Sequence, residues 1–297
     1  MVLRALRPGG LWGLPGAARR WLERSGVERA GRRAAAQPSD VRHRGRRVPP
    51  GPVHVAPDRP GVRFEYAPDE SYQDVGGGQV LHSAPGFPGF PARLALELFE
   101  RARVLAGTGR VGLWDPMCGA GGIVATLALL RRDALTRVLA SDVSDRALEL
   151  AVKNLRLTTP EGLAQRRGQL RAQSAVTGRL ESVDRLLEKV RRGPPVPADL
   201  ARADATDPAD VARLDLAGIG VVIADLPYGT QADWSSEAPT PAARTLRTLA
   251  GALGAGAVIV LSTVNREDLR GCPPALRSFK HGRRHLRMYR VEEPTAR

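Results

Sequence analysis

Four aspartates in this chain each close a short apolar stretch. They are Asp115 in WDPMCGAGG, Asp142 in ASDVSD, Asp204 in RADATD and Asp225 in ADLPYG. If each stretch is a strand of one parallel sheet, the four carboxylates meet at its carboxyl edge, where open α/β sheets bind their ligands. Carboxylates there can accept hydrogen bonds from an ammonium group, from ribose hydroxyls and from an exocyclic amine.

The glycines after Asp115 indicate what the first carboxylate serves. Gly119 and Gly121 stand where a strand gives way to a helix, so backbone N–H groups and the positive helix end face the ligand. A dinucleotide site would have a third glycine where this chain has Val124, and it would not usually place an acid at the end of the first strand. Asp115, Gly119 and Gly121 therefore favour a ligand that carries an ammonium group and a carboxylate.

The next two acids complete a nucleoside pattern. Asp142 lies 21 residues after Gly121, the spacing at which an acid binds both ribose hydroxyls, and Asp204 could accept the exocyclic amine of an adenine. An adenosine joined to an amino acid is S-adenosylmethionine, which is the cofactor we predict. Taken singly, Asp142 and Asp204 could each instead be the N-cap of the helix that follows.

The stretch Asp225, Leu226, Pro227, Tyr228 could hold the group that is methylated. If the substrate is a nucleic-acid base, hydrogen bonds to Asp225 and to a carbonyl of residue 226 or 227 would aim a base nitrogen at the methyl donor, and Asp225 would be the general base where that nitrogen must first lose a proton. We predict Asp225, Pro227 and Tyr228 as catalytic, with Tyr228 stacking on the base for about 1 to 3 kcal/mol. The alternative for Tyr228 is a loop aromatic packed under the sheet edge.

A Pro/Gly loop upstream, LHSAPGFPGFP over residues 81–91, could complete the pocket. Its aromatic residues Phe87 and Phe90 would shape the pocket or cover the cofactor, or else they anchor the loop to the core. His82 precedes these aromatics and joins them, with Leu226, as a predicted substrate-binding residue. The other histidines show no metal-ligand spacing, and we predict no metal site.

Repeated strand–helix units would place these residues. Strands are predicted at residues 110–115, 137–142, 199–204, 220–225 and 257–262. Helices are predicted at residues 92–106, 121–132, 144–156, 208–214 and 240–252. Residues 159–194 read as a helical insertion, and 275–291 as a closing antiparallel hairpin. This order predicts an α/β, Rossmann-like fold around a mainly parallel seven-stranded sheet.

Charge and composition indicate how the chain is divided and where the protein functions. The net charge is +14, and residues 1–63 hold 14 arginines but only 4 acidic residues. We predict that this basic leader is disordered and that residues 64–297 form one domain; an arm that follows RNA, a solvated extension and an organelle transit peptide are the alternatives for the leader. Two cysteines argue against a disulfide framework, and no apolar run reaches the roughly 20 residues of a membrane span. We expect a cytoplasmic monomer without membrane contact.

Arginines in the insertion and the hairpin could contact phosphates, or they could form solvated faces. They are Arg166, Arg167, Arg171, Arg179, Arg185, Arg191 and Arg192 in the insertion, and Arg283, Arg284, Arg287 and Arg290 in the hairpin.

DPMCGAG, SDVSDRALELAVKNL and ADLPYG, in this order and spacing, resemble the class I S-adenosylmethionine methyltransferases that act on nucleic-acid bases. With LHSAPGFPGFPARLALELF and the helical insertion, they resemble the avilamycin-resistance (AviRa) family of rRNA methyltransferases from about residue 79 to the final hairpin. The resemblance implies a Rossmann-like methyltransferase fold and methyl transfer to a guanine, at N2 or N1, of 23S rRNA in the large ribosomal subunit. It also implies a role in resistance to a ribosome-targeting antibiotic.

The resemblance also implies roles by position. Asp115, Gly119 and Gly121 would hold the methionine end of the cofactor, Asp142 the ribose and Asp204 the adenine, while residues 225–228 would hold the target base. Leucine stands at position 226 where the commonest form has proline, and an acid leads where adenine-N6 enzymes often have asparagine. Two alternatives stay open: S-adenosylmethionine-dependent methylation of a protein glutamine or a small-molecule amine, and non-enzymatic RNA binding.

Overall fold

The computed structural model of the chain describes residues 2–4, 64–76, 78–107, 109–173, 177–227 and 240–293. Tyr228 and all of the predicted leader except residues 2–4 lie outside the described residues. Among the residues that are described, no helix combines the length and the apolar character that crossing a bilayer requires.

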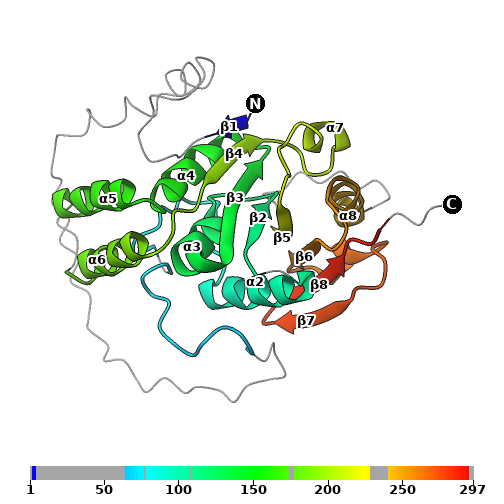
Figure 1. Cartoon of the computed structure of the whole chain (residues 1–297), viewed down its shortest axis with the longest axis horizontal. Helices are drawn as coiled ribbons and strands as arrows, with labels where there is room; N and C mark the ends of the chain where they lie inside the picture. Colours follow the sequence, from blue (N-terminus) through cyan, green and yellow to red (C-terminus); the bar gives the residue numbers. More distant parts are fainter. Residues whose placement is uncertain are drawn as a thin grey trace, which may run out of the picture.

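The domain is built on one mixed sheet with helices on both faces (Figure 1). Its strands follow the order β1-β4-β3-β2-β5-β6-β8-β7. They are β1 (Val2–Arg4), β2 (Val111–Asp115), β3 (Leu135–Asp142), β4 (Ala198–Arg202), β5 (Ile219–Asp225), β6 (Val258–Thr263), β7 (Arg277–His281) and β8 (Arg284–Arg290). Strands β4, β3, β2, β5 and β6 are parallel, and β8 is antiparallel to both β6 and β7.

The predicted fold class is confirmed, with one correction at the sheet edge. Strands β2 to β8 are the seven expected strands, and β7 and β8 form the closing hairpin. Val2–Arg4, in the leader that we predicted to be disordered, pair antiparallel with β4 and add an eighth strand. The outer edge of β4 offers unpaired backbone groups, which a short extended segment satisfies.

Strand β5 shows why its sequence is continuously apolar. Val221 and Ile223 point into the core beneath helices α2 (Ala92–Ala106), α3 (Gly122–Leu130) and α4 (Asp145–Arg156). Val222 and Ala224, on the opposite face, pack against helices α7 (Pro208–Val211) and α8 (Pro241–Ala252). Because side chains alternate across a sheet that is covered on both faces, every position of the strand is apolar until the cavity edge is reached.

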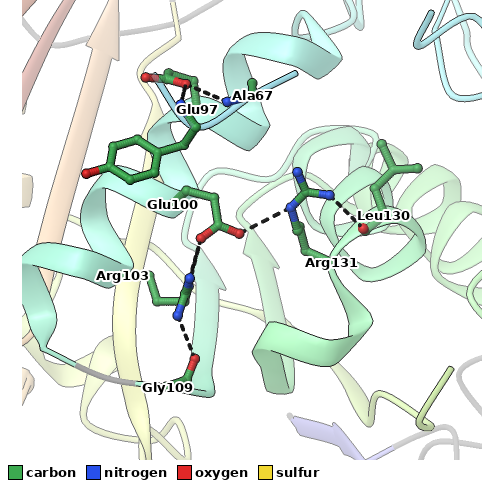
Figure 2. A network of polar contacts seen from close by, with 8 residues as sticks. Ala67, Glu97, Glu100, Arg103, Gly109, Leu130 and Arg131 are labelled. Carbon is green, nitrogen blue, oxygen red and sulfur yellow. Dashed lines mark hydrogen bonds and ion pairs between the residues drawn. The ribbon is translucent and has the colours of Figure 1, made fainter. Parts of the chain in front are cut away.

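Two buried carboxylates fix helix α2 to the chain on either side of it (Figure 2). Glu97 accepts hydrogen bonds from the backbone N–H groups of residues 65, 66 and 67, at 2.8 to 2.9 Å. Glu100 pairs with Arg103 and, at 3.2 Å, with Arg131 at the end of α3, while Arg103 also donates to the carbonyl of Gly109. Hydrogen bonds to Glu97 therefore hold residues 65–67, at the start of the segment that precedes α2, against the edge of the core.

The insertion forms two helices, α5 (Pro160–Ala172) and α6 (Thr177–Arg192), which lie side by side at the end of the domain remote from α8 (Figure 1). Three of its arginines bind residues 74–80. Arg166 donates to the carbonyl of Val80 (2.9 Å), Arg179 to the carbonyls of residues 78 and 79, and Arg185 pairs with Asp74 at 2.7 Å. Arg166 and Arg179 thus brace the segment that leads into the Pro/Gly loop, and Arg185 joins them through its ion pair with Asp74 while its side chain stays 49% exposed.

Candidate functional site

One cavity of about 1230 Å³ opens above the carboxyl edge of the sheet, and all four aspartates line it. The sequence-predicted site residues on its wall are His82, Phe87, Phe90, Asp115, Gly119, Asp142, Asp204, Asp225, Leu226 and Pro227. Gly121 is absent from this wall, and Tyr228 lies outside the described residues. Pockets for a single small ligand usually measure about 300 to 1,000 Å³, so this cavity has room for a cofactor and part of a second molecule.

The two glycines of the turn between β2 and α3 have different surroundings. Both have positive φ, +51° at Gly119 and +73° at Gly121, a conformation that favours glycine. A Cβ on Gly119 would point toward Phe87 across the loop, at 3.7 Å, whereas a Cβ on Gly121 would come within 3.1 Å of the Ala151 Cβ in α4. Gly121 therefore permits the close packing of α4, and Gly119 lies against the cavity.

Asp115 carries the most strongly perturbed carboxyl group of the cavity. It is fully buried, and its Oδ1 accepts one weak hydrogen bond, from the backbone N–H of Met117 at 3.3 Å. Burial raises the pKa of Asp115 well above its usual range, and the negative charges of Asp225 and Asp142 raise it further. A cationic ligand would relieve this repulsion.

Asp142 ties the glycine turn to the end of β3. Its Oδ2 accepts from the backbone N–H of Gly119 and its Oδ1 from that of Ser144, both at 2.9 Å. The N-cap of α4 is Ser144, so the alternative reading of Asp142 as a cap is wrong. Burial raises the pKa of Asp142, and the backbone N–H groups oppose this rise. Each carboxylate oxygen keeps a lone pair for a further donor, such as a ribose hydroxyl.

Asp204 lies two residues beyond the end of β4. Its Oδ1 accepts from both the backbone N–H and the hydroxyl of Thr206, each at 2.8 Å. The helix that follows, α7, is capped by Asp207, so the cap reading is wrong for Asp204 as well. Its own N–H donates to Asp210, which fixes the turn at the cavity wall.

Asp225 closes β5 and is held from the neighbouring strands. The hydroxyl of Ser262 in β6 donates to its Oδ1 at 2.7 Å, and the guanidinium of Arg284 at the start of β8 forms an ion pair with the same oxygen. Burial raises the pKa of Asp225, while Arg284 and Ser262 oppose the rise. Arg284 is thus an internal partner of the predicted catalytic acid and not a surface arginine of the hairpin.

Leu226 lines the cavity but belongs to the core. The residue is 1% exposed and packs beneath α8, and its N–H donates to the carbonyl of Ser262 at 2.7 Å. The substrate contact of Leu226 stays a prediction, and with the side chain packed in the core it would have to be made by the main chain.

Asn154, in α4, is a site residue that the sequence reasoning missed. Its buried side chain accepts from the N–H of His82 (2.7 Å) and donates to the carbonyls of His82 (2.9 Å) and Ala120 (2.8 Å). It thereby joins the Pro/Gly loop to the glycine turn. Burial, with the positive charges of Arg166 and Lys153, lowers the pKa of His82 to about 4, so this histidine is neutral at pH 7.

Both loop aromatics face the cavity and also stabilise the loop. The guanidinium of Arg146 lies 5.4 Å from the ring centre of Phe87, and that of Arg284 lies 4.6 Å from the ring centre of Phe90. Phe90 also packs against the main core cluster. The two interpretations, cavity wall and loop anchor, hold together for Phe90.

These residues suit a cofactor that combines a positive charge with a nucleoside. Three clustered carboxylates favour a cation, Gly119 leaves the backbone accessible, and Asp142 and Asp204, the residues predicted to bind ribose and adenine, retain accepting capacity. A doubly wound sheet with this cavity at its carboxyl edge and an antiparallel closing hairpin defines a class I S-adenosylmethionine-dependent methyltransferase.

Comparisons with known proteins narrow the class to a family. The family model described as rRNA methyltransferase AviRa matches residues 62–284. Over 231 residues the chain is 42% identical to the 23S rRNA (guanine(2535)-N(1))-methyltransferase of Streptomyces viridochromogenes, covering 74% of this chain and 92% of the relative. Solved structures of the rRNA methyltransferase aviRa from this organism, at 1.5 and 2.4 Å, are 40% identical and give TM-scores of 0.69 and 0.68; each alignment covers 77% of this chain and 97% of the other.

The chain belongs to the AviRa family of rRNA methyltransferases. The resemblance predicted from its motifs is confirmed, and the match begins upstream of residue 79, where those motifs start. Membership favours rRNA over a protein glutamine or a small amine as the substrate, and an enzyme over a protein that only binds RNA.

Proposed function

We propose that this chain transfers a methyl group from S-adenosylmethionine to N1 of a guanine in 23S rRNA. The observation that carries the proposal is the position of Asp225, a largely enclosed acid at the end of β5 that lines the cavity with Asp115, Asp142 and Asp204. The relative from S. viridochromogenes, whose name specifies guanine N1 in 23S rRNA, supports the choice of atom.

Four residues of the cavity would hold the cofactor. Asp115 and Gly119 would face its methionine end, Asp142 the ribose hydroxyls and Asp204 the adenine amine. When bound, S-adenosylmethionine supplies an electrophilic methyl group on a positively charged sulfur. The negative charges of Asp115 and Asp142 would favour binding of that sulfonium over the neutral product.

Guanine N1 carries a proton, and its lone pair can attack only when the proton leaves. Asp225 accepts this proton. Burial makes its carboxylate a stronger base than an exposed aspartate, while Arg284 and Ser262 favour the ionised form that can act. The guanine must leave its helix to arrive here, and Phe87, Phe90 and Pro227 provide apolar walls for it.

Mass spectrometry of rRNA nucleosides tests the proposal. The protein is incubated with S-adenosylmethionine and either free 23S rRNA or assembled large subunits, and the digest is compared with N1- and N2-methylguanosine standards. We expect N1-methylguanosine, reduced by about 10²- to 10⁴-fold in Asp225→Asn with cofactor affinity retained. N2-methylguanosine would contradict the assignment to N1, and methylation of protein alone would contradict the rRNA substrate. Expression in a susceptible bacterium should also raise its tolerance of avilamycin.

A further inference from the structure

The C-terminal hairpin brings a cation to the predicted catalytic acid. Asp225 is aligned with Ser262 of β6, and Ser262 is aligned with Leu286 of β8. Arg284, two residues before Leu286, follows the hairpin turn at Gly282, whose φ is +56°. The turn therefore starts β8 at the height of the cavity, and the arginine side chain reaches across β6 to Asp225.

The arginine is enclosed. The side chains of Arg284 and Asp225 are 11% and 19% exposed. Its Nη1 donates to Asp225 Oδ1 and, at 3.2 Å, to the hydroxyl of Ser262, and that hydroxyl donates to Asp225 Oδ1 at 2.7 Å. The ring of Phe90, 4.6 Å away, stacks against the guanidinium. Two strands, β6 and β8, therefore fix one oxygen of the acid, and the Pro/Gly loop holds the arginine through Phe90.

The two carboxylate oxygens differ as a result. Both hydrogen bonds that described residues make to the side chain of Asp225 end on Oδ1. The adjacent strand β2 ends in Asp115, whose own charge Asp225 disfavours. Within the part of the chain that the structure describes, Oδ2 is left with its full accepting capacity, on a residue that lines the cavity.

We propose that Arg284 and Ser262 are positioning residues, which hold Oδ1 of Asp225 so that Oδ2 receives the proton from the base, and that Arg284 sets the pH range in which Asp225 is ionised. The inference rests on the proposed function of Asp225 and deepens it. A largely enclosed carboxylate on the strand next to Asp115 would lose its charge without a compensating cation, and a protonated Asp225 cannot accept a proton.

The charged groups around Asp225 give the sign of the effect. Asp115 on β2 and burial favour the neutral form, and Arg284 on β8 favours the ionised form. An opposite charge at this range lowers the pKa of an acid by about 1 to 3, so removal of Arg284 should raise the midpoint of the acidic limb of kcat by a similar amount. Activity lost at pH 7 should then return in part at pH 9.

The test compares variants in initial-rate assays with 23S rRNA from pH 5 to 9. Arg284→Met removes the positive charge, and Arg284→Lys keeps the charge but lacks the planar guanidinium group. Ser262→Ala removes one hydrogen bond to Asp225. Arg137→Met is the matched control, because Arg137 forms an ion pair of similar burial with Asp199 (17% and 18% exposed) near the amino end of β3, away from the cavity. Thermal unfolding establishes that each variant is folded at the assay temperature.

We expect kcat of Arg284→Met to fall at least tenfold at pH 7, with the midpoint of the acidic limb of its pH profile at higher pH. Arg284→Lys should return that midpoint to the wild-type pH without restoring the full kcat. Ser262→Ala should lower kcat and move the midpoint by less than Arg284→Met does. Arg137→Met should leave both kcat and the midpoint unchanged. An unchanged pH profile in folded Arg284→Met would overturn the inference, as would a change confined to KM for rRNA, which would make Arg284 an RNA-binding residue. If the wild type forms no N1-methylguanosine, the proposed function fails instead.

Discussion

Replacing Asn154 by alanine should release the Pro/Gly loop from the glycine turn. The side chain is 1% exposed and satisfies three backbone groups: the N–H of His82, the carbonyl of His82 and the carbonyl of Ala120. Each buried group that loses its partner costs about 1 to 3 kcal/mol, and water entering the vacated space recovers part of this. We expect a loss of about 3 to 5 kcal/mol in the free energy of unfolding, which for a domain of this size lowers Tm by roughly 10 °C.

Urea unfolding of the ligand-free protein at pH 7, followed by circular dichroism, measures this loss. The matched control is Asn265→Ala, because Asn265 is exposed and its side chain caps the short helix Arg266–Leu269 through the N–H of Glu267 at 3.2 Å. Loss of such a cap costs about 1 kcal/mol. A loss below about 1 kcal/mol in Asn154→Ala, or one equal to that of the control, would refute the claim that Asn154 holds the loop.

Four further substitutions probe the cavity and the glycine turn beside it. Asp115→Asn should raise the Tm of the ligand-free protein at pH 7, and calorimetry should show weaker cofactor binding. The raised pKa of Asp115 means that its charged form destabilises the folded protein; this destabilisation is absent below the pKa of the unfolded state and grows as pH rises. Gly121→Ala should lower the free energy of unfolding by about 1 to 2 kcal/mol because of the positive φ alone, and by more because of contact with Ala151. Gly119→Ala should weaken cofactor binding. Equal effects of the two substitutions on cofactor binding would contradict the roles given to these glycines. His82 takes a proton near pH 6.5 when unfolded but only near pH 4 when folded, so stability should fall as pH drops through this window. His82→Asn should flatten that dependence, and an unchanged slope would count against a buried neutral His82.

The strand ends were predictable because they depend on local patterns. A buried parallel strand leaves an apolar run, and the acids that close β2, β3 and β5 mark the carboxyl edge without any knowledge of contacts. The partners of those acids were not predictable in this way. Arg284 and Asp225 are 59 residues apart in the sequence, and Asn154 and His82 are 72 apart. A pattern of neighbouring residues therefore cannot predict either contact.

The insertion shows the opposite difficulty. A helix rich in arginine looks like a solvated or phosphate-binding face, and only the fold of residues 78–80 over α5 and α6 shows that Arg166 and Arg179 donate to backbone carbonyls. Sequence pattern counts charges along a helix, but it does not show whether a distant loop covers them.

This bracing has a consequence for how the family can diversify. The helices α5 and α6 carry the donors and residues 78–80 carry the acceptors, so deleting either partner leaves buried polar groups without a bond in the other. The insertion and the approach to the Pro/Gly loop should therefore be inherited as one unit. We expect homologues that shorten the insertion to carry a rebuilt approach segment. Chimaeras that keep α5 and α6 should need an approach segment of the same length, so that its carbonyls meet Arg166 and Arg179.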